Sequence, residues 1–196
     1  MDKIASFCID HDKLVPGIYL SRIDGDVKTY DIRMRRPNTP PYLENAALHT
    51  LEHLFATFAR NSEWKDHVIY FGPMGCRTGC YFLLKDMEEA DAVRLIRSIF
   101  RQIAEYEGEI PGATAKECGN YLEHDLAGAR KEAQDFLPII EDWDERNLVY
   151  PAYLVLEILS ISRCGAESFT AAVSVGIRHT VFMAFFRSLM YNPSRE

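Results

Sequence analysis

The sequence predicts an α+β protein in which a mostly antiparallel sheet is covered by helices. Two observations lead to this class: short, strand-like segments cluster early in the chain, and longer segments with apolar residues at helical spacing alternate with them and follow them. The chain has 196 residues, of which 47% are hydrophobic and 26% are charged, as expected for one folded domain with an appendage. We expect a domain over residues 1–149 and a helical C-terminal extension over residues 150–196.

The expected strands are residues 27–34, 67–71 and 80–84. In the first, residues alternate between an apolar face and a polar face that carries Asp31 and Arg33. Arg33 is suited to an anionic group of a substrate, and the alternative is a solvated strand face with surface ion pairs. The other two strands flank a turn rich in glycine, residues 72–79, with Cys76 at its tip.

Three helical segments are expected in the same part of the chain. The first follows Pro41 and ends near Arg60, and the second opens at Asp86 with a pattern that resembles a capping box. The third runs through Leu122 to Phe136. Two apolar tracts, residues 153–162 and 169–190, lie near the end of the chain, and neither is the uninterrupted apolar run that a membrane span requires.

Composition limits the partners. The formal net charge is -7, and Lys and Arg nowhere form a long run, so we expect no nucleic acid partner. Because neither apolar tract is uninterrupted over the length of a membrane span, we also expect no membrane partner. Residues 1–12 carry charges every few positions and lack the apolar centre of a signal peptide, which predicts a cytoplasmic protein. In that compartment the five cysteines are expected to be thiols, ligands or catalysts; they are Cys8, Cys76, Cys80, Cys118 and Cys164.

The segment that points to chemistry is His49-Thr50-Leu51-Glu52-His53. On a helix, two histidines four residues apart share one face, and Glu52 lies beside them. Neutral imidazoles with this separation bind divalent transition metals, whereas the alternative is a pair of packed or surface histidines. A metal site needs a further ligand, and Cys118 and Cys76 are the candidates, one as ligand and the other as catalyst. For Cys76 the alternatives are a reactive thiol and an inert buried one.

Three separated motifs resemble the S-ribosylhomocysteine lyase (LuxS) family in order and approximate spacing. They are His49-Thr50-Leu51-Glu52-His53, Gly72-Pro73-Met74-Gly75-Cys76-Arg77-Thr78-Gly79, and Glu117-Cys118-Gly119 followed by His124-Asp125-Leu126. Two shorter matches, Ser6-Phe7 with Asp10-His11 and Asp31-Ile32-Arg33 ahead of Pro37-Asn38, extend the resemblance over roughly residues 3–137. The resemblance implies a LuxS/metallohydrolase-like fold. The chain departs from many members at Tyr70 and Gly72, where they have an acidic residue and a serine.

The resemblance also implies a set of site residues. His49, His53 and Cys118 are expected to bind one divalent metal per subunit, Fe²⁺ in the family's native form and replaceable by Zn²⁺ or Co²⁺, with a fourth position left open. Cys76 and Glu52 are the expected catalytic residues. The expected substrate-binding residues are Ser6, His11 and Arg33.

The implied reaction is the cleavage of the thioether of S-ribosylhomocysteine, which yields homocysteine and 4,5-dihydroxy-2,3-pentanedione. This reaction belongs to the methionine cycle, and the second product is the precursor of a quorum-sensing autoinducer. The resemblance further implies a homodimer with its site at the interface. Two alternatives stay open. One is a metallopeptidase of the inverted zincin type, with Glu117 or Glu123 as third ligand, and the other is a non-catalytic metal-binding module with four closed ligands.

Overall fold

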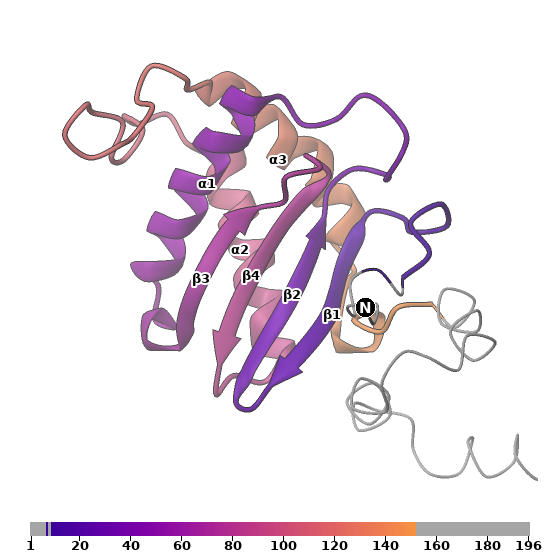
Figure 1. Ribbon diagram of the computed structural model, residues 1–196. Coiled ribbons are helices and arrows are strands. Elements are labelled where there is room, and N and C mark those ends of the chain that lie inside the picture. Colours follow the sequence, from indigo (N-terminus) through magenta and orange to yellow (C-terminus); the bar gives the residue numbers. More distant parts are fainter. Residues whose placement is uncertain (1–6, 8, 152–196) are drawn as a thin grey trace, which may run out of the picture.

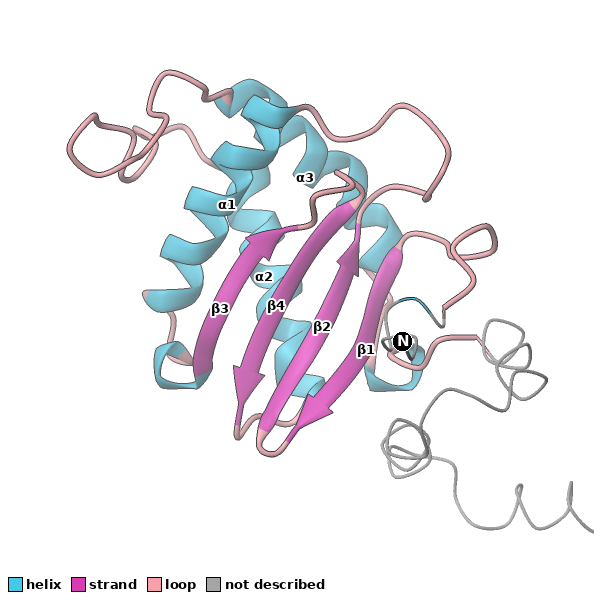
Figure 2. Ribbon diagram, viewed as in Figure 1, coloured by secondary structure: helices cyan, strands magenta, loops and turns pink. Residues whose placement is uncertain are grey.

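The computed structural model describes residue 7 and residues 9–151. Four antiparallel strands form one sheet in the order β1-β2-β4-β3, with β1 (Gly17–Asp24), β2 (Val27–Arg33), β3 (Val68–Pro73) and β4 (Gly79–Lys85). Three helices, α1 (Asn45–Arg60), α2 (Glu89–Glu105) and α3 (Leu126–Ile140), lie on one face of this sheet (Figures 1 and 2). The expected α+β class with an antiparallel sheet is therefore confirmed. Except for Tyr150 and Pro151, the expected helical extension lies outside the described residues.

Aromatic packing holds α1 on the sheet. Phe55 of α1 is fully buried, and its ring stacks on Phe71 of β3 with the centroids 3.9 Å apart. The same ring meets the rings of Phe82 of β4 and Phe100 of α2 edge-on, at 5.0 Å and 5.5 Å. Because this contact fixes the rotation of α1 about its axis, it also fixes the direction in which the opposite face of the helix points.

Strand β2 is buried on both of its faces. Tyr30 and Ile32 pack into the core under the helices, as the alternation predicted. Asp31 and Arg33 on the other face are each only 2% exposed, so the alternative of a solvated strand face is wrong. Charged side chains are almost never buried in this way unless they are paired, and these two form an ion pair.

The structure differs from the sequence prediction at three elements. Strand β1 was not anticipated, because an irregular register between Leu20 and Arg22 interrupts its alternation. Helix α2 begins at Glu89 without a side-chain cap, so the expected capping box is wrong; Asp86 instead adopts a left-handed conformation with φ 49°. Helix α3 begins only at Leu126, where Asp125 caps it, and Leu122 is 81% exposed in the loop before it.

Two short 3-10 turns, η2 (Lys65–His67) and η3 (Glu145–Asn147), complete the described elements. The segment that follows α3 returns to the edge of the sheet, where the backbone N–H of Leu20 in β1 donates to the carbonyl of Leu148 at 2.8 Å. Over residue 7 and residues 9–151, no helix combines the length and the apolar character needed to cross a membrane.

Candidate metal centre

Helix α1 presents His49 and His53 on one face, with their ring centroids 4.8 Å apart. The long loop between α2 and α3 brings Cys118 to this pair, although Cys118 lies 65 residues beyond His53 in the sequence. Its Sγ atom is 3.4 Å from Nε2 of His49 and 3.7 Å from Nε2 of His53. The structure thus brings together the three residues that the sequence indicated as metal ligands.

A fourth donor, His124, belongs to the same cluster. Its Nε2 atom is 4.0 Å from Sγ of Cys118, and its ring stacks on that of His49 with the centroids 4.1 Å apart. The four donor atoms all lie within 4.8 Å of one another. Sequence reasoning matched His124 within a motif and assigned it no role. The signal was a histidine six residues after Cys118, close enough to return to the same point.

Backbone carbonyls fix the ring orientation of the two helix histidines. Nδ1 of His49 donates to the carbonyl of Glu123 at 2.9 Å, and Nδ1 of His53 donates to the carbonyl of Pro111 at 2.7 Å. Gly112, which follows Pro111 with φ 71°, lies against the His53 ring where a larger residue would be strained. With the proton on Nδ1, each Nε2 atom keeps its lone pair for a metal.

Thr50 fixes the ring orientation of His124. Its hydroxyl donates to the carbonyl of Ala46 at 2.9 Å, and it therefore accepts a hydrogen bond from Nδ1 of His124 at 3.0 Å. The same oxygen accepts from the backbone N–H of Asp125 at 2.8 Å, which pins the start of α3 to α1. A residue between the two helix histidines therefore orients the third imidazole.

The donor set fits a divalent transition metal. Burial lowers the pKa of His124, and the neighbouring His49 and His53 lower it further, so the imidazole stays in the neutral form that ligates metals. Usual Zn–S and Zn–N distances in a tetrahedral site place sulfur and nitrogen roughly 3.6 Å apart. The three sulfur–nitrogen distances here, 3.4, 3.7 and 4.0 Å, lie around that value.

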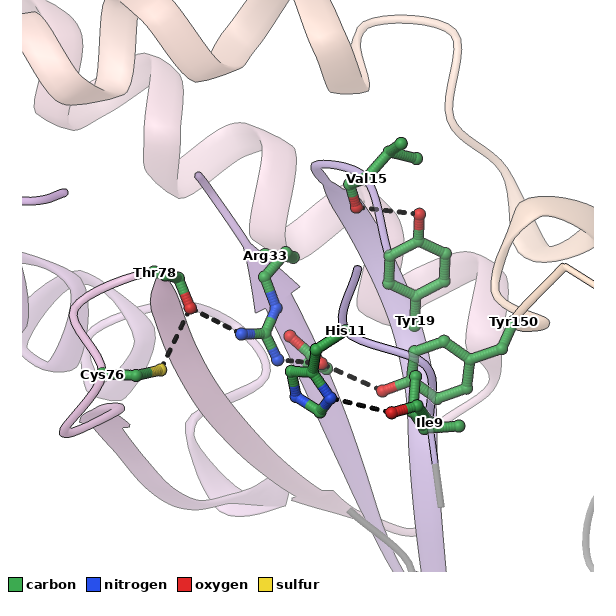
Figure 3. Close-up of polar contacts among 9 residues, drawn as sticks. Ile9, His11, Val15, Tyr19, Arg33, Cys76, Thr78 and Tyr150 are labelled. Carbon is green, nitrogen blue, oxygen red and sulfur yellow. Dashed lines mark hydrogen bonds and ion pairs between the residues drawn. The ribbon is translucent and has the colours of Figure 1, made fainter. Parts of the chain in front are cut away.

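Cys76 lies in a separate network of contacts, on the exposed turn between β3 and β4 (Figure 3). Its Sγ atom is 3.0 Å from Oγ1 of Thr78, which accepts a hydrogen bond from Nη1 of Arg33 at 2.6 Å. Arginine only donates, so the hydroxyl hydrogen of Thr78 remains available to the sulfur of Cys76. This arrangement places a hydrogen-bond donor beside the sulfur of Cys76.

Arg33 already has a carboxylate partner inside the protein. Its Nη2 atom donates to Oδ2 of Asp31 at 2.7 Å, while Nε of Arg33 and Oδ1 of Asp31 have no partner among the described residues. Both side chains line a small cavity together with Ile9, His11, Leu14, Ser21, Tyr81 and Tyr150. The structure therefore places the expected substrate-binding residues His11 and Arg33 at one cavity.

Two expected site residues remain, Glu52 and Ser6. Glu52 is half-buried on α1, and Ser6 lies outside the described residues. Tyr70 packs over Gly72, so a side chain at position 72 would overlap the Tyr70 hydroxyl. Cys80 is fully buried, and burial raises its pKa well above the usual range, which identifies it as a core thiol.

Glu117 and Glu123 are absent from the donor cluster of the described residues, which is made of three histidines and one cysteine. Among the described residues, the cluster therefore lacks the carboxylate ligand that the peptidase alternative requires. An α+β fold with one cluster of imidazole and thiol donors and a separate exposed thiol defines a metal-binding protein with a free cysteine outside its metal centre.

Comparisons with known proteins agree with this class. Residues 4–147 match the family described as S-ribosylhomocysteinase (LuxS), so the chain belongs to the LuxS family. It is 50% identical over 157 residues to the S-ribosylhomocysteine lyase of Borreliella burgdorferi (strain ZS7), a match that covers 77% of this chain and 100% of the relative. It is 51% identical over 158 residues to the S-ribosylhomocysteine lyase of Clostridium beijerinckii, covering 77% of this chain and 99% of the relative.

Proposed function

We propose that this protein is a metal-dependent lyase that cleaves the thioether of S-ribosylhomocysteine to homocysteine and 4,5-dihydroxy-2,3-pentanedione. The observation that carries the proposal is the convergence of His49, His53 and Cys118 on one point, in a chain about half identical to lyases of that name. A divalent metal at this point supplies Lewis-acid polarisation of a substrate carbonyl oxygen.

The protein residues move the protons of this reaction. The sugar carbonyl has to migrate along the ribose chain, so protons must leave one carbon and return to another before the carbon–sulfur bond breaks by β-elimination. Cys76 is the proposed base for these carbon-bound protons, supported by its hydrogen bond to Thr78. Glu52, next to His53 on the same helix, is proposed to move protons among the substrate oxygens and to protonate the leaving thiolate.

Substrate binding is assigned to Ser6, His11 and Arg33. The cavity shared by His11 and Arg33 supports this assignment for two of the three. Because Arg33 is tied to Asp31 and Thr78, its proposed role is to present a fixed positive charge near Cys76 as well as near the substrate.

His124 favours one alternative and has to be reconciled with catalysis. Four protein donors make the closed set of a non-catalytic metal module, whereas a catalytic site needs one exchangeable position. His124 has the longest separation from Cys118, at 4.0 Å, so we propose that His49, His53 and Cys118 would hold the metal and that His124 would be the exchangeable donor. With an exchangeable donor, the metal would have the open position that Lewis-acid chemistry requires.

A homodimer with its site at the interface is also proposed. In the described part of the chain the helices lie on one face of the sheet, and β3 exposes Ile69 (39%) and Tyr70 (52%). Leu122, in the loop between α2 and α3 that carries Cys118, is 81% exposed. A second copy would cover these apolar side chains, and the interface would lie next to the loop that carries Cys118.

The finer assignments follow from the same proposal. The metal is proposed to be Fe²⁺, with Zn²⁺ or Co²⁺ as replacements, because one thiolate and several imidazoles suit all three ions. The protein is proposed to act in the cytoplasm, in the methionine cycle, with its second product serving as a precursor of a quorum-sensing autoinducer. Residues 1–149 are the proposed lyase domain, and residues 150–196 are the proposed extension.

The test is a thiol-release assay on anaerobically prepared full-length protein with S-ribosylhomocysteine as substrate. We expect homocysteine to appear at a rate proportional to the metal content of the preparation. Binding of one metal ion per chain without any thiol release would favour the non-catalytic metal module. Cleavage of a peptide substrate without thiol release would favour the peptidase.

A further inference from the structure

One side chain outside the expected domain contacts the network that ends at Cys76. The hydroxyl of Tyr150 donates a hydrogen bond to Oδ2 of Asp31 at 2.9 Å (Figure 3). The same oxygen accepts from Arg33, and Arg33 continues through Thr78 to Cys76. We propose that Tyr150 is a positioning residue for Cys76, because its hydroxyl fixes the Asp31 carboxylate and thereby the Arg33 guanidinium.

Burial makes this chain of contacts specific. Asp31, Arg33 and Thr78 are each 2% exposed, so water offers them few alternative partners. Oδ1 of Asp31 has no partner among the described residues, which leaves Arg33 and Tyr150 as the donors that hold the carboxylate. In a buried network with so few partners, the loss of one hydrogen bond changes the geometry and charge of the remaining ones.

The ring of Tyr150 is held independently of its hydroxyl. It stacks on Tyr19 with the centroids 4.8 Å apart and the planes within 14°. Trp143 meets the ring of Tyr19 edge-on, with the centroids 5.8 Å apart, and its Nε1 donates to the carbonyl of Ile18 at 2.8 Å. Replacement of Tyr150 by Phe therefore keeps the ring in place and removes only the contacts of the hydroxyl, with Asp31 and with the Ser21 side chain.

The hydroxyl also stays protonated where enzymes work. Burial, followed by the negative charge of Asp31, raises the pKa of Tyr150 well above its usual value. Tyr150 therefore acts as a constant donor to Asp31. Without the hydrogen bond from Tyr150, more of the negative charge of Asp31 would act on Arg33. The electrostatic effect of Arg33 on Thr78 and Cys76 would then be weaker. The hydrogen bond between Thr78 and the sulfur of Cys76 would be weakened in turn.

The test compares full-length wild-type protein with Tyr150→Phe at equal metal content. The readout is the rate at which iodoacetamide alkylates Cys76 across a range of pH, followed by mass spectrometry of the Cys76 peptide because the chain has other cysteines. We expect Tyr150→Phe to alkylate about threefold more slowly near neutral pH, the size expected for one hydrogen bond of ordinary net strength, with the pH profile displaced to higher pH.

A matched control is Tyr30→Phe. Tyr30 precedes Asp31 on β2 but faces the helices, and its hydroxyl has no partner in the part of the chain that is described. This variant should alkylate at the wild-type rate. Equal alkylation profiles for wild type and Tyr150→Phe, or equal slowing in both Phe variants, would overturn the role of Tyr150.

A kinetic comparison links this inference to the proposed lyase activity, on which its catalytic meaning rests. Tyr150→Phe should lower kcat for homocysteine release about threefold while metal content stays unchanged. Because Tyr150 also lines the cavity that holds His11 and Arg33, KM is measured separately from kcat. If the wild-type protein releases no homocysteine, the proposed function fails, and the alkylation profiles still decide whether Tyr150 positions Cys76. A change in KM alone would contradict the positioning role.

Discussion

The hydroxyl of Thr50 lies 3.0 Å from Nδ1 of His124, and this contact ties the start of α3 to the middle of α1. Thr50 lies between His49 and His53 in the sequence and is fully buried. Helix α1 therefore carries two metal donors on one face and, one residue after His49, the group that orients a third. The metal centre therefore depends on the contact between α1 and the loop before α3, and not on the pair of histidines alone.

Replacement of Thr50 by Val should weaken metal binding. Val has nearly the shape of Thr but leaves Nδ1 of His124 without its acceptor, and it leaves the N–H of Asp125 with only the carbonyl of Ala46, at 3.3 Å. We expect metal affinity to fall by about 10-fold or more, measured by competition with a chromogenic chelator. Thr57→Val, about two turns further along α1, is the control. Unchanged affinity in Thr50→Val would show that His124 is not oriented through Thr50.

Replacement of Cys118 and replacement of Cys76 should have different effects on metal content and on activity. Cys118→Ala removes the only thiol donor of the cluster among the described residues, so its metal content should fall far below the roughly one ion per chain expected of the wild type. Cys76→Ala should keep its metal and lose homocysteine release. Metal analysis and the thiol-release assay on the same preparations check both. Full activity in Cys76→Ala would remove Cys76 from the proposed mechanism.

Stability should fall in alkali. Burial raises the pKa values of Cys80, Tyr30 and Tyr150, which in an unfolded chain would lose protons near 9.0 for the thiol and 10.0 for the two phenols. Above these values the folded state binds more protons than the unfolded state, so the free energy of unfolding decreases as pH rises. Urea unfolding at about pH 8 and about pH 10.5 measures the decrease. Tyr150→Phe should lessen it, and an unaltered decrease would contradict the assignment.

The aromatic contact under α1 should control stability. Phe55→Ala would leave a cavity among Phe71, Phe82 and Phe100, at a cost of about 3–5 kcal/mol in the free energy of unfolding. Phe58→Ala on the same helix, at a half-buried position, is the control and should cost about 1 kcal/mol. Chemical denaturation of the two variants measures both values. Equal losses would show that Phe55 does not have the central place in the core that its contacts indicate.

Local patterns in the sequence carry much of the fold. Alternation over residues 27–34 predicted β2, and helical spacing around His49 predicted α1, because side-chain period depends on secondary structure alone. Strand β1 escaped prediction because its irregular register breaks the alternation. The start of α3 was placed too early, since Leu122 is apolar but has no core residue to pack against and is exposed.

By itself, the sequence determined which residues have the chemistry for metal binding and thiol reactivity, because helical spacing already places His49 and His53 side by side. Only the tertiary structure decided that His124 joins them, that Arg33 is buried against Asp31, and that Tyr150 reaches the network of Cys76. The reason is physical: these contacts join segments far apart in the chain. Their geometry is set by the packing of the helices and of the segment after α3 against the sheet, and a local pattern of residues does not encode it.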